Sequence, residues 1–404
     1  MKVLILHQHF NTPQKGGALR SYYLAKALSD RGIQTVVITS HNEANYQQKD
    51  VEGLKVHYLA VAYDNKFGFA ARSISFLKFV WKSVRLAGQV SDVDVCYAIS
   101  APLTVGLAAL WIKRRHRIPF LFEVGDLWPD APIQLGFVQN YFLRRILYAL
   151  EKLIYRHADS IVVLSPAIQT AVERKMPDKT THLIPNMADL DFYRPTTKKD
   201  QRLEKEFDTQ GKFVVTYAGA VGVANGLDYI VGCATASSKA NLPIQFFLCG
   251  EGAELDRLKA LAGRLGLLNV TFAGFKNREG VRDLFTISDA AFVCYKNVPI
   301  LETGSPNKYF DGLAAGKLIV VNFGGWIKNE IEGNHCGIYV DPQDPSDFVV
   351  KIRTFLEDKG KLKQFQDASR QLAVSKYSRE MLSAKFTDLF IKHGVPMNRP
   401  LLRS

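Results

Sequence analysis

The sequence predicts an α/β protein of two domains, each a doubly wound parallel sheet, and the two sheets are expected to face a cleft. The 404 residues are too many for one ordinary hydrophobic core and suit two. Short apolar runs alternate with amphipathic helical segments almost throughout, which is typical of βαβ units. The alternation restarts after a polar stretch at residues 196–208, which we interpret as the linker region and the edge of a second domain.

The first half begins with an apolar strand at residues 3–6. A helix is expected at 18–31, because Leu19 and Tyr22 begin an apolar pattern of helical spacing that Gly32 stops. Further strands are expected at 35–39, 93–98, 119–124 and 160–164.

An uncharged segment at residues 96–112 could be mistaken for a membrane span. It is shorter than the ~20 residues that usually cross a bilayer, and Ser100 and Pro102 interrupt it. We therefore expect a buried strand, a turn at Pro102 and a buried helix.

The second half repeats the alternation of strands and helices. It is expected to contain a helix at 227–239 and strands at 213–217, 244–249, 270–272, 290–294 and 318–321. A last helix is expected at 378–393, with Ser378 as its N-cap. We place the first domain at residues 1–188, the second at 189–377, and a C-terminal helix and tail at 378–404, which we expect to pack back towards the first domain.

The segment from Ser305 to Gly316 predicts a short helix with an anion site at its start. Ser305 suits the N-cap, Pro306 the first helical position, and Gly316 the C-terminal end. Free N–H groups and the positive end of the helix dipole favour phosphate there. Lys308 and Asp311 are three residues apart and share a face, so one can meet phosphate while the other accepts hydrogen bonds from sugar hydroxyls. The same pattern also fits an ordinary, well-capped αβ unit.

In each half, a glycine-rich loop follows the first strand. Gly16 and Gly17 allow the backbone to approach a phosphate or sugar, although such a pair is often only a turn. The loop 219–226, which contains Gly219 and Gly222, can cradle phosphate through its N–H groups. It has neither the Gly-x-Gly-x-x-Gly spacing nor the Lys-Ser/Thr pair of a P-loop, which argues against a kinase or ATPase.

Composition narrows the classes of partner without choosing one. The formal net charge is +13, which suits anionic partners such as nucleotides, nucleic acid or an anionic membrane. Five scattered cysteines indicate a reduced, cytosolic protein without a zinc site. No histidine pair or Asp-x-Asp triplet has the context of a metal site, so no metal and no cofactor are expected.

These motifs together resemble those of the retaining glycosyltransferases of the GT-B fold, family 4. The resemblance covers nearly the whole chain and is carried by Gly16-Gly17 and the segments 125–129, 217–228, 272–275 and 305–316. Within the family, the chain is most similar to bacterial enzymes of O-antigen and capsule assembly, including N-acetylfucosaminyl transferases. The resemblance implies Rossmann-like domains, the N-terminal one binding the acceptor and the C-terminal one the nucleotide sugar, and it implies metal-independent donor binding.

The resemblance also implies roles for single residues. Asp311 occupies the place of the family's second motif glutamate, which binds the ribose hydroxyls. Asp126 would face the donor sugar and acceptor. Backbone groups would contact the diphosphate or donor sugar at Ser305, Pro306 and Asn307, and the base at Phe275 after the Gly274 turn.

The chain departs from the family pattern at four positions, one of which is Asp311, an aspartate in place of the second glutamate. The first motif glutamate falls on Thr303, with Glu302 beside it, so it is absent or shifted by one. The usual loop Arg and Lys fall on Ala220 and Asn225. Lys308 is the best replacement for those cations, and Lys296 is a weaker candidate. The predicted catalytic residues are therefore Asp126, Lys308 and Glu302.

The helix expected at 72–86 is basic and aromatic, and basic residues near 113–117 and 144–156 add more charge to the same half. A core helix with a solvated face is in general the commoner explanation of such a pattern, but the resemblance favours an anionic membrane surface at the inner face of the cytoplasmic membrane. The expected activity is transfer of a sugar, N-acetylfucosamine or a similar one, from a nucleotide diphosphate donor, UDP preferred, to a polyprenyl-diphosphate-linked glycan.

Two other functions remain open at this point. One is a nucleotide-sugar epimerase on the same fold, which would act without an acceptor. The other is a non-enzymatic protein that binds nucleic acid or a surface through its charge. The basic residues are not gathered on a recognised reader module, so nucleic acid is not expected as a partner.

Overall fold

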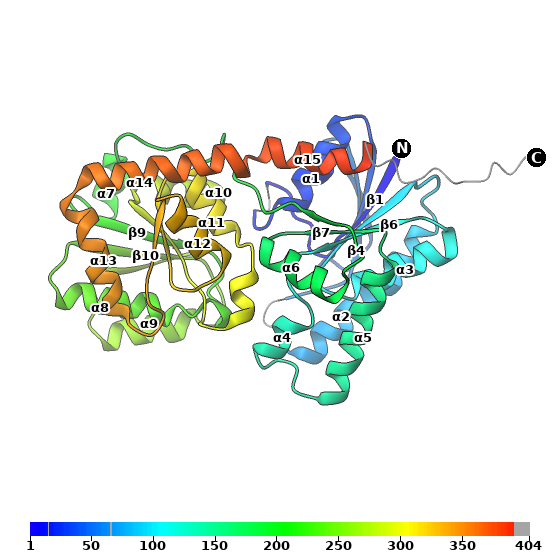
Figure 1. Ribbon diagram of the computed structural model, residues 1–404, viewed down its shortest axis with the longest axis horizontal. Helices are drawn as coiled ribbons and strands as arrows, with labels where there is room; N and C mark the ends of the chain where they lie inside the picture. The colour runs from blue at the N-terminus through cyan, green and yellow to red at the C-terminus, as the bar shows by residue number, and fades with distance from the viewer. Residues whose placement is uncertain (15, 65–66, 392–404) are drawn as a thin grey trace, which may run out of the picture.

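A computed structural model of the chain describes residues 1–14, 16–64 and 67–391. It confirms the predicted fold class: two α/β domains lie side by side, each built around its own largely parallel sheet (Figure 1). The first domain takes the order β3-β4-β2-β1-β5-β6-β7-β8, and the second takes β11-β10-β9-β12-β13-β14. Every neighbouring pair is parallel except β3 with β4, which is an antiparallel edge pair.

The first sheet contains β1 (Lys2–Leu6), β2 (Gln34–His41), β3 (Gln47–Val51), β4 (Leu54–Ala60), β5 (Val95–Ile99), β6 (Phe120–Val124), β7 (Ser160–Val163) and β8 (Thr181–Leu183). Its helices are α1 (Arg20–Asp30), α2 (Phe69–Ala87), α3 (Val105–His116), α4 (Asp130–Gln134), α5 (Tyr141–His157) and α6 (Pro166–Lys175). Alternate residues of β1 enter different cores: Val3 and Ile5 lie on the α1 side, while Leu4 and Leu6 lie on the side of α2, α3 and α5.

The second sheet contains β9 (Phe213–Ala218), β10 (Ile244–Cys249), β11 (Val270–Gly274), β12 (Ala290–Val293), β13 (Leu318–Val321) and β14 (Gly337–Tyr339). Its helices and turns are α7 (Gln201–Glu206), η1 (Val223–Asn225), α8 (Asp228–Lys239), α9 (Leu255–Arg264), α10 (Arg278–Ile287), η2 (Pro299–Thr303), α11 (Asn307–Ala314), α12 (Trp326–Gly333), α13 (Pro345–Glu357) and α14 (Lys359–Leu372). The polar stretch 196–208 therefore contains a helix of the second domain, with Leu203 buried against Phe247 and Leu284.

The uncharged segment 96–112 folds as predicted, into β5, a turn at Pro102 and the start of α3. Over the described residues, no helix combines the length and apolar character that crossing a bilayer requires.

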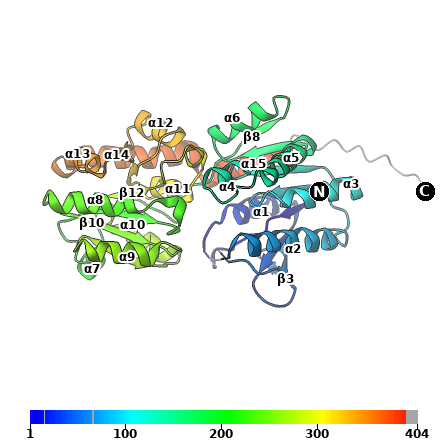
Figure 2. The same cartoon turned by 90° about the horizontal axis from the view of Figure 1, so that it is seen from below.

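The chain passes between the domains twice, and the two passages pair with one another. A parallel bridge joins Ala188 to Ser378, through the hydrogen bonds Ala188 N–H to the Tyr377 carbonyl (2.8 Å) and Arg379 N–H to the Ala188 carbonyl (3.0 Å). The returning segment runs through η3 (Ala373–Tyr377) into α15 (Arg379–Ile391), which packs on α1 of the first domain (Figures 1 and 2).

The last helix is capped as predicted, since the Ser378 hydroxyl accepts a hydrogen bond from Met381 N–H (3.2 Å). The predicted end of this helix at 392–393 and the tail to residue 404 lie outside the described residues.

Candidate active site

The helix α11 begins at the junction of the domains, but not with the cap that the sequence predicts. Pro306 is its N-cap and Asn307 its first residue, so the prediction of Ser305 as the cap and Pro306 as the first helical position was wrong by one residue. Ser305 is held instead by the chain crossing: its hydroxyl and carbonyl accept hydrogen bonds from Asn186 N–H (3.4 Å) and Nδ2 (2.5 Å). Gly316, at φ +60°, ends the helix as predicted.

Lys308, in the first turn of α11, lies in a cage of neutral groups. Its Nζ donates to Asn225 Oδ1 (2.9 Å) and Tyr217 Oη (3.1 Å). The same Nζ lies 4.6 Å from the ring centre of Tyr217 and 4.7 Å from that of Tyr295. Among the described residues no carboxylate pairs with this ammonium. Burial lowers the pKa of Lys308 to about 8, because nothing in the cage compensates the charge fully.

The loop after β9 shapes this cage. A Cβ at Gly219 would lie 3.1 Å from Lys308 Cε and 3.3 Å from Tyr217 Oη, so a side chain there would disturb both. A Cβ at Gly222 would make only an ordinary contact with Asn225, at 3.6 Å. Gly219 and Asn225 are therefore brought to the predicted site, and Asn225 acts there as an acceptor for Lys308.

Tyr295 follows β12 and links the cage to the first domain. Asn322 fixes its backbone with two 3.0 Å hydrogen bonds, one to the N–H and one to the carbonyl. Asp126, which follows β6, lies close enough for its charge to contribute to the raised pKa of Tyr295, after burial. Asp126 is exposed, yet the protein around its carboxyl partly withdraws that group from water, which raises its own pKa.

Asp311, one turn after Lys308, meets a different set of charges. Burial raises the pKa of Asp311 to about 7, and Asp189 adds to this, while Arg278 opposes it. Arg278 is tied to Asp189 by a 2.5 Å hydrogen bond and ion pair. Lys308 and Asp311 therefore offer a cation and a carboxyl group at two neighbouring places along α11.

Asp189 gathers groups from three parts of the chain. It accepts hydrogen bonds from Tyr23 Oη of α1 (3.0 Å) and Arg278 of α10 (2.5 Å), and it pairs with Arg379 of α15 (2.7 Å). These cations lower the pKa of Asp189 although burial opposes them. This cluster lies where the chain crosses between the domains, and it joins α1 of the first domain to α10 of the second.

The remaining predicted site residues lie away from the Lys308 cage or contribute only their backbone conformation. Glu302 turns towards the start of α12, where a Cβ on Gly324 would lie 3.0 Å from its Oε1, and no hydrogen bond in the described residues joins it to Lys308. Gly16 (φ +71°) and Gly17 (φ +82°) adopt the left-handed conformation, as does Gly274 (φ +65°). The ring of Phe275 is exposed, and so is the side chain of Asn307.

Sequence reasoning missed the aromatic residues of the site and the charged cluster around Asp189. Tyr217 and Tyr295 lie at the carboxyl ends of predicted strands, and that position was the available signal. His7 and His9, at the end of β1, were also missed: burial lowers the pKa of His7 to about 3 and that of His9 to about 4, so both are neutral imidazoles at the same edge of the first sheet. Over the described residues, no group of three or more His, Cys, Asp or Glu side chains could hold a metal ion.

Two family models match consecutive parts of the chain. Residues 15–187 match the "Glycosyl transferase 4-like domain" and residues 198–372 match "Glycosyl transferases group 1". Together the two models cover most of the sequence. The chain is therefore a glycosyltransferase built from these two family domains, with the GT-B architecture.

Individual relatives are distant. The chain is 19% identical over 251 residues to an alpha-D-kanosaminyltransferase of Streptomyces kanamyceticus, an alignment covering 61% of this chain and 63% of that protein. It is 22% identical over 247 residues to WcaI of Escherichia coli strain K12, assigned as a colanic acid biosynthesis glycosyl transferase, covering 60% of this chain and 58% of that protein. The alignments thus span about three fifths of the length of these curated relatives.

Solved structures share the fold over nearly the whole chain. Sucrose-phosphate synthase from Thermosynechococcus elongatus superposes with a TM-score of 0.79 at 17% identity, covering 98% of this chain and 99% of that one. Anabaena HepE, crystallised with UDP and glucose, gives a TM-score of 0.71 at 17% identity, covering 97% and 100%.

Proposed function

We propose that the protein is a retaining glycosyltransferase that moves a sugar from a nucleotide diphosphate, UDP preferred, to a lipid-linked glycan in surface polysaccharide synthesis. The observation that carries the proposal is the Lys308 ammonium, which has no carboxylate partner in the described structure and lies at the start of α11 where the domains meet. A leaving diphosphate needs such a charge. The similarity to HepE, which was crystallised with UDP, and to WcaI supports the choice of donor class and pathway type.

In the proposed reaction, the bond between the anomeric carbon and the β-phosphate oxygen breaks as the acceptor hydroxyl forms a new bond on the same face. The acceptor proton passes to the leaving diphosphate. Lys308 and the N–H groups at the start of α11 stabilise the charge that develops on that diphosphate. Closure of the domains would exclude water from the reacting groups.

The remaining site residues orient the two substrates. Asp311 would accept hydrogen bonds from the ribose hydroxyls, and the backbone at Phe275 would hold the base. Asp126 comes from the first domain and lies near enough to Tyr295 of the second for its charge to act on it, so it suits the donor sugar and the incoming acceptor hydroxyl. Glu302 is oriented towards α12, so any role in binding the donor sugar would require it to turn.

The first domain also presents an apolar and basic face that supports membrane attachment. The exposed side chains on α2 include Ile74, Leu77 and Trp81, and those on α5 include Phe142 (74% exposed) and Ile146. These helices flank α3 on one side of the first sheet, and the basic segments 72–86, 113–117 and 144–156 lie in these three helices or at their ends. We infer that this face rests on an anionic bilayer, with the protein on the cytoplasmic side.

Calorimetric titration with UDP, GDP, dTDP and CMP, with and without EDTA, tests the donor site. We expect one nucleoside diphosphate, UDP, to bind and EDTA to make no difference. A folded protein that binds none of them contradicts the proposal. Incubating the matching nucleotide sugar without an acceptor tests the rival activity, since an epimerase would convert it.

A further inference from the structure

A cavity of about 450 Å³ lies at the opposite end of the first sheet from the candidate active site. It is lined by Lys2 at the start of β1, Gln34 at the start of β2 and Lys55 near the start of β4. These strands run parallel to β5 and β6, and β6 leads to Asp126 at its other end. The cavity is therefore separate from the positions proposed for the donor and the acceptor. Its volume is in the range of small-ligand sites.

One wall of this cavity contains a buried histidine with an unpaired nitrogen. His57 of β4 lines the cavity and is only 4% exposed. Its Nδ1 is hydrogen-bonded to Tyr46 Oη (2.6 Å), whereas its Nε2 is buried without a hydrogen-bond partner in the described part of the chain. Burial and the charge of Lys55 lower the pKa of His57, so the ring is a neutral imidazole at pH 7. A buried polar atom without a partner is costly, and a ligand hydroxyl would remove that cost.

Neutral amides supply most of the other polar groups of the lining. The side chains of Gln34, Gln48 and Gln89 line the cavity, and none of them is hydrogen-bonded to another described residue. Gln48 lies directly opposite His57 in the register of β3 with β4. An amide group both accepts and donates hydrogen bonds, as a hydroxyl group does. The lining therefore matches a ligand that carries several hydroxyl groups.

The charged residues of the lining argue against an anionic ligand. They are Lys2, Lys55 and Asp50. Lys2 Nζ already donates to the Ser91 carbonyl (2.9 Å), and Asp50 lies opposite Lys55 in the strand register. A phosphate drawn to Lys55 would thus be repelled by the neighbouring carboxylate, whereas a hydroxyl group can donate a hydrogen bond to it.

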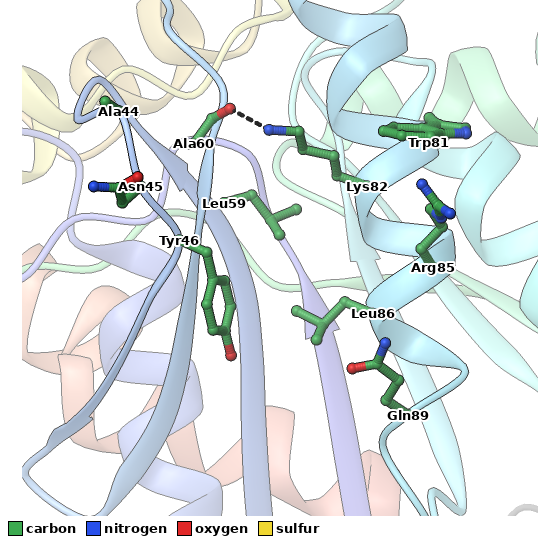
Figure 3. Close-up of a pocket in the computed structure, with 10 residues that line it drawn as sticks. All are labelled: Ala44, Asn45, Tyr46, Leu59, Ala60, Trp81, Lys82, Arg85, Leu86 and Gln89. Carbon is green, nitrogen blue, oxygen red and sulfur yellow. Dashed lines mark hydrogen bonds between the residues drawn. The ribbon is translucent and has the colours of Figure 1, made fainter.

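Apolar side chains complete the cavity. Val36 of β2, Leu86 of α2 and Val90 line it. Tyr46, Leu86 and Gln89 also line an adjacent cavity of about 320 Å³. Figure 3 shows the Tyr46 hydroxyl and the Gln89 amide at the same end of this smaller cavity, so the two cavities meet there. Aliphatic groups beside hydrogen-bonding groups suit a pyranose ring, which combines C–H faces with a rim of hydroxyls.

We propose that this cavity is a second carbohydrate site, which binds a neutral mono- or disaccharide through His57, the three glutamines and Asp50. The chemistry of the lining carries the choice. A sugar bound here lies at the opposite strand ends from Asp126 and is not a substrate of the transfer. The inference therefore goes beyond the proposed function and does not depend on it.

Titration followed by saturation-transfer NMR tests the site, with the methyl glycosides of glucose, galactose, mannose, fucose and N-acetylglucosamine as probes. We expect at least one of them to bind the parent protein equally well with and without UDP. Gln48→Trp, on the exposed strand β3, places an indole in the cavity and should weaken this binding at least tenfold. Lys49→Trp is the matched control, because Lys49 is the next residue of the strand and lies over the ring of Tyr58 (5.7 Å) on the other face of the sheet. It should bind the sugar as the parent does.

A second pair of variants tests the imidazole. His57→Phe keeps a ring but removes both nitrogens, and it should weaken the sugar at least fivefold. His41→Phe is its control: His41 is also buried with an unpaired Nε2 in the described structure, but it packs near Tyr58 and does not line this cavity. This control should leave the affinity unchanged.

Three results would overturn the proposal. They are failure of the parent to bind any of the glycosides, parent-like binding by either Gln48→Trp or His57→Phe, and displacement of the sugar by an equal or lower concentration of inorganic phosphate. The last result would assign the cavity to anions. Loss of sugar binding when UDP is added would place the sugar in the cleft and would likewise overturn it. Absence of UDP binding would contradict the proposed donor site alone and would leave the comparison of the variants unaffected.

Discussion

Replacing Lys308 by methionine should remove most of the catalysis while leaving the fold intact. Methionine has nearly the same length and keeps the contact with the two tyrosine rings, but it carries no charge. Loss of an electrostatic contact to a leaving group typically costs about 2.7–4 kcal/mol of barrier, so kcat should fall by roughly a hundredfold to a thousandfold. The melting temperature should change little, because relief of a buried charge offsets the loss of a donor to Asn225.

The pKa of Lys308 gives this prediction a signature that a merely structural role would not produce. With a pKa of about 8, the ammonium is about nine-tenths protonated at pH 7 and about one-tenth at pH 9. The kcat/KM of the parent enzyme, which reports the free enzyme, should therefore fall about tenfold between those values. Lys308→Met should show no such fall, because the titrating group is gone.

The assay is initial-rate transfer to a lipid-linked acceptor, measured from pH 6 to 9.5 with a nucleotide sugar. Lys351→Met is the matched control: this lysine also lies over a tyrosine ring, Tyr339 (5.5 Å), but it pairs with Asp347 (2.7 Å) away from the site. Its rates should equal those of the parent. Retention of a third or more of the parent kcat by Lys308→Met, or persistence of the alkaline fall in that variant, would refute the reasoning.

Three further predictions address the neighbouring groups. Folding raises the pKa of Asp311 from 3.8 to about 7, so the free energy of unfolding falls as pH rises from about 4 to 7. Asp311→Asn removes this buried carboxyl group and should therefore raise the melting temperature at pH 7. The same variant should bind UDP more weakly above pH 7, because the carboxylate that would accept hydrogen bonds from the ribose is gone. Gly219→Ala should weaken UDP binding, measured by calorimetry, by about 1–3 kcal/mol, because the added methyl group would press on Lys308. Gly222→Ala should bind UDP as the parent does, because its methyl group makes only an ordinary contact. Asp189→Asn should lower the free energy of unfolding in urea by about 3–5 kcal/mol, because Arg278 loses its carboxylate; an unchanged value would show that this cluster contributes nothing.

The sequence allowed the fold to be predicted because its apolar runs are short, regular and separated by turn residues. The same reasoning found the helix after Ser305 and its glycine stop, both of which depend on local chemistry. It misplaced the cap because Asn186, far away in the chain, occupies the Ser305 hydroxyl and carbonyl. A local pattern contains no information about a partner 119 residues distant.

The tyrosine cage was missed for a related reason. Tyrosines at strand ends are usually core residues, and only the tertiary fold shows that Tyr217 and Tyr295 both meet one ammonium. Likewise, the spacing of Asp189, Arg278 and Arg379 in the sequence does not predict that they converge. They meet only because the two segments that cross between the domains pair with one another.

The neutral cage offers an explanation for a site with fewer cations than the family pattern. By the resemblance, Ala220 and Asn225 take the places of the arginine and lysine of that pattern, and in the proposed reaction Lys308 is the chief cation for the diphosphate. A carboxylate partner would hold Lys308 in place but would cancel its charge. Hydrogen bonds to Asn225 and Tyr217, with two ring faces, orient the ammonium and leave that charge available. The consequence is a lowered pKa, and an enzyme built in this way should work best below pH 8.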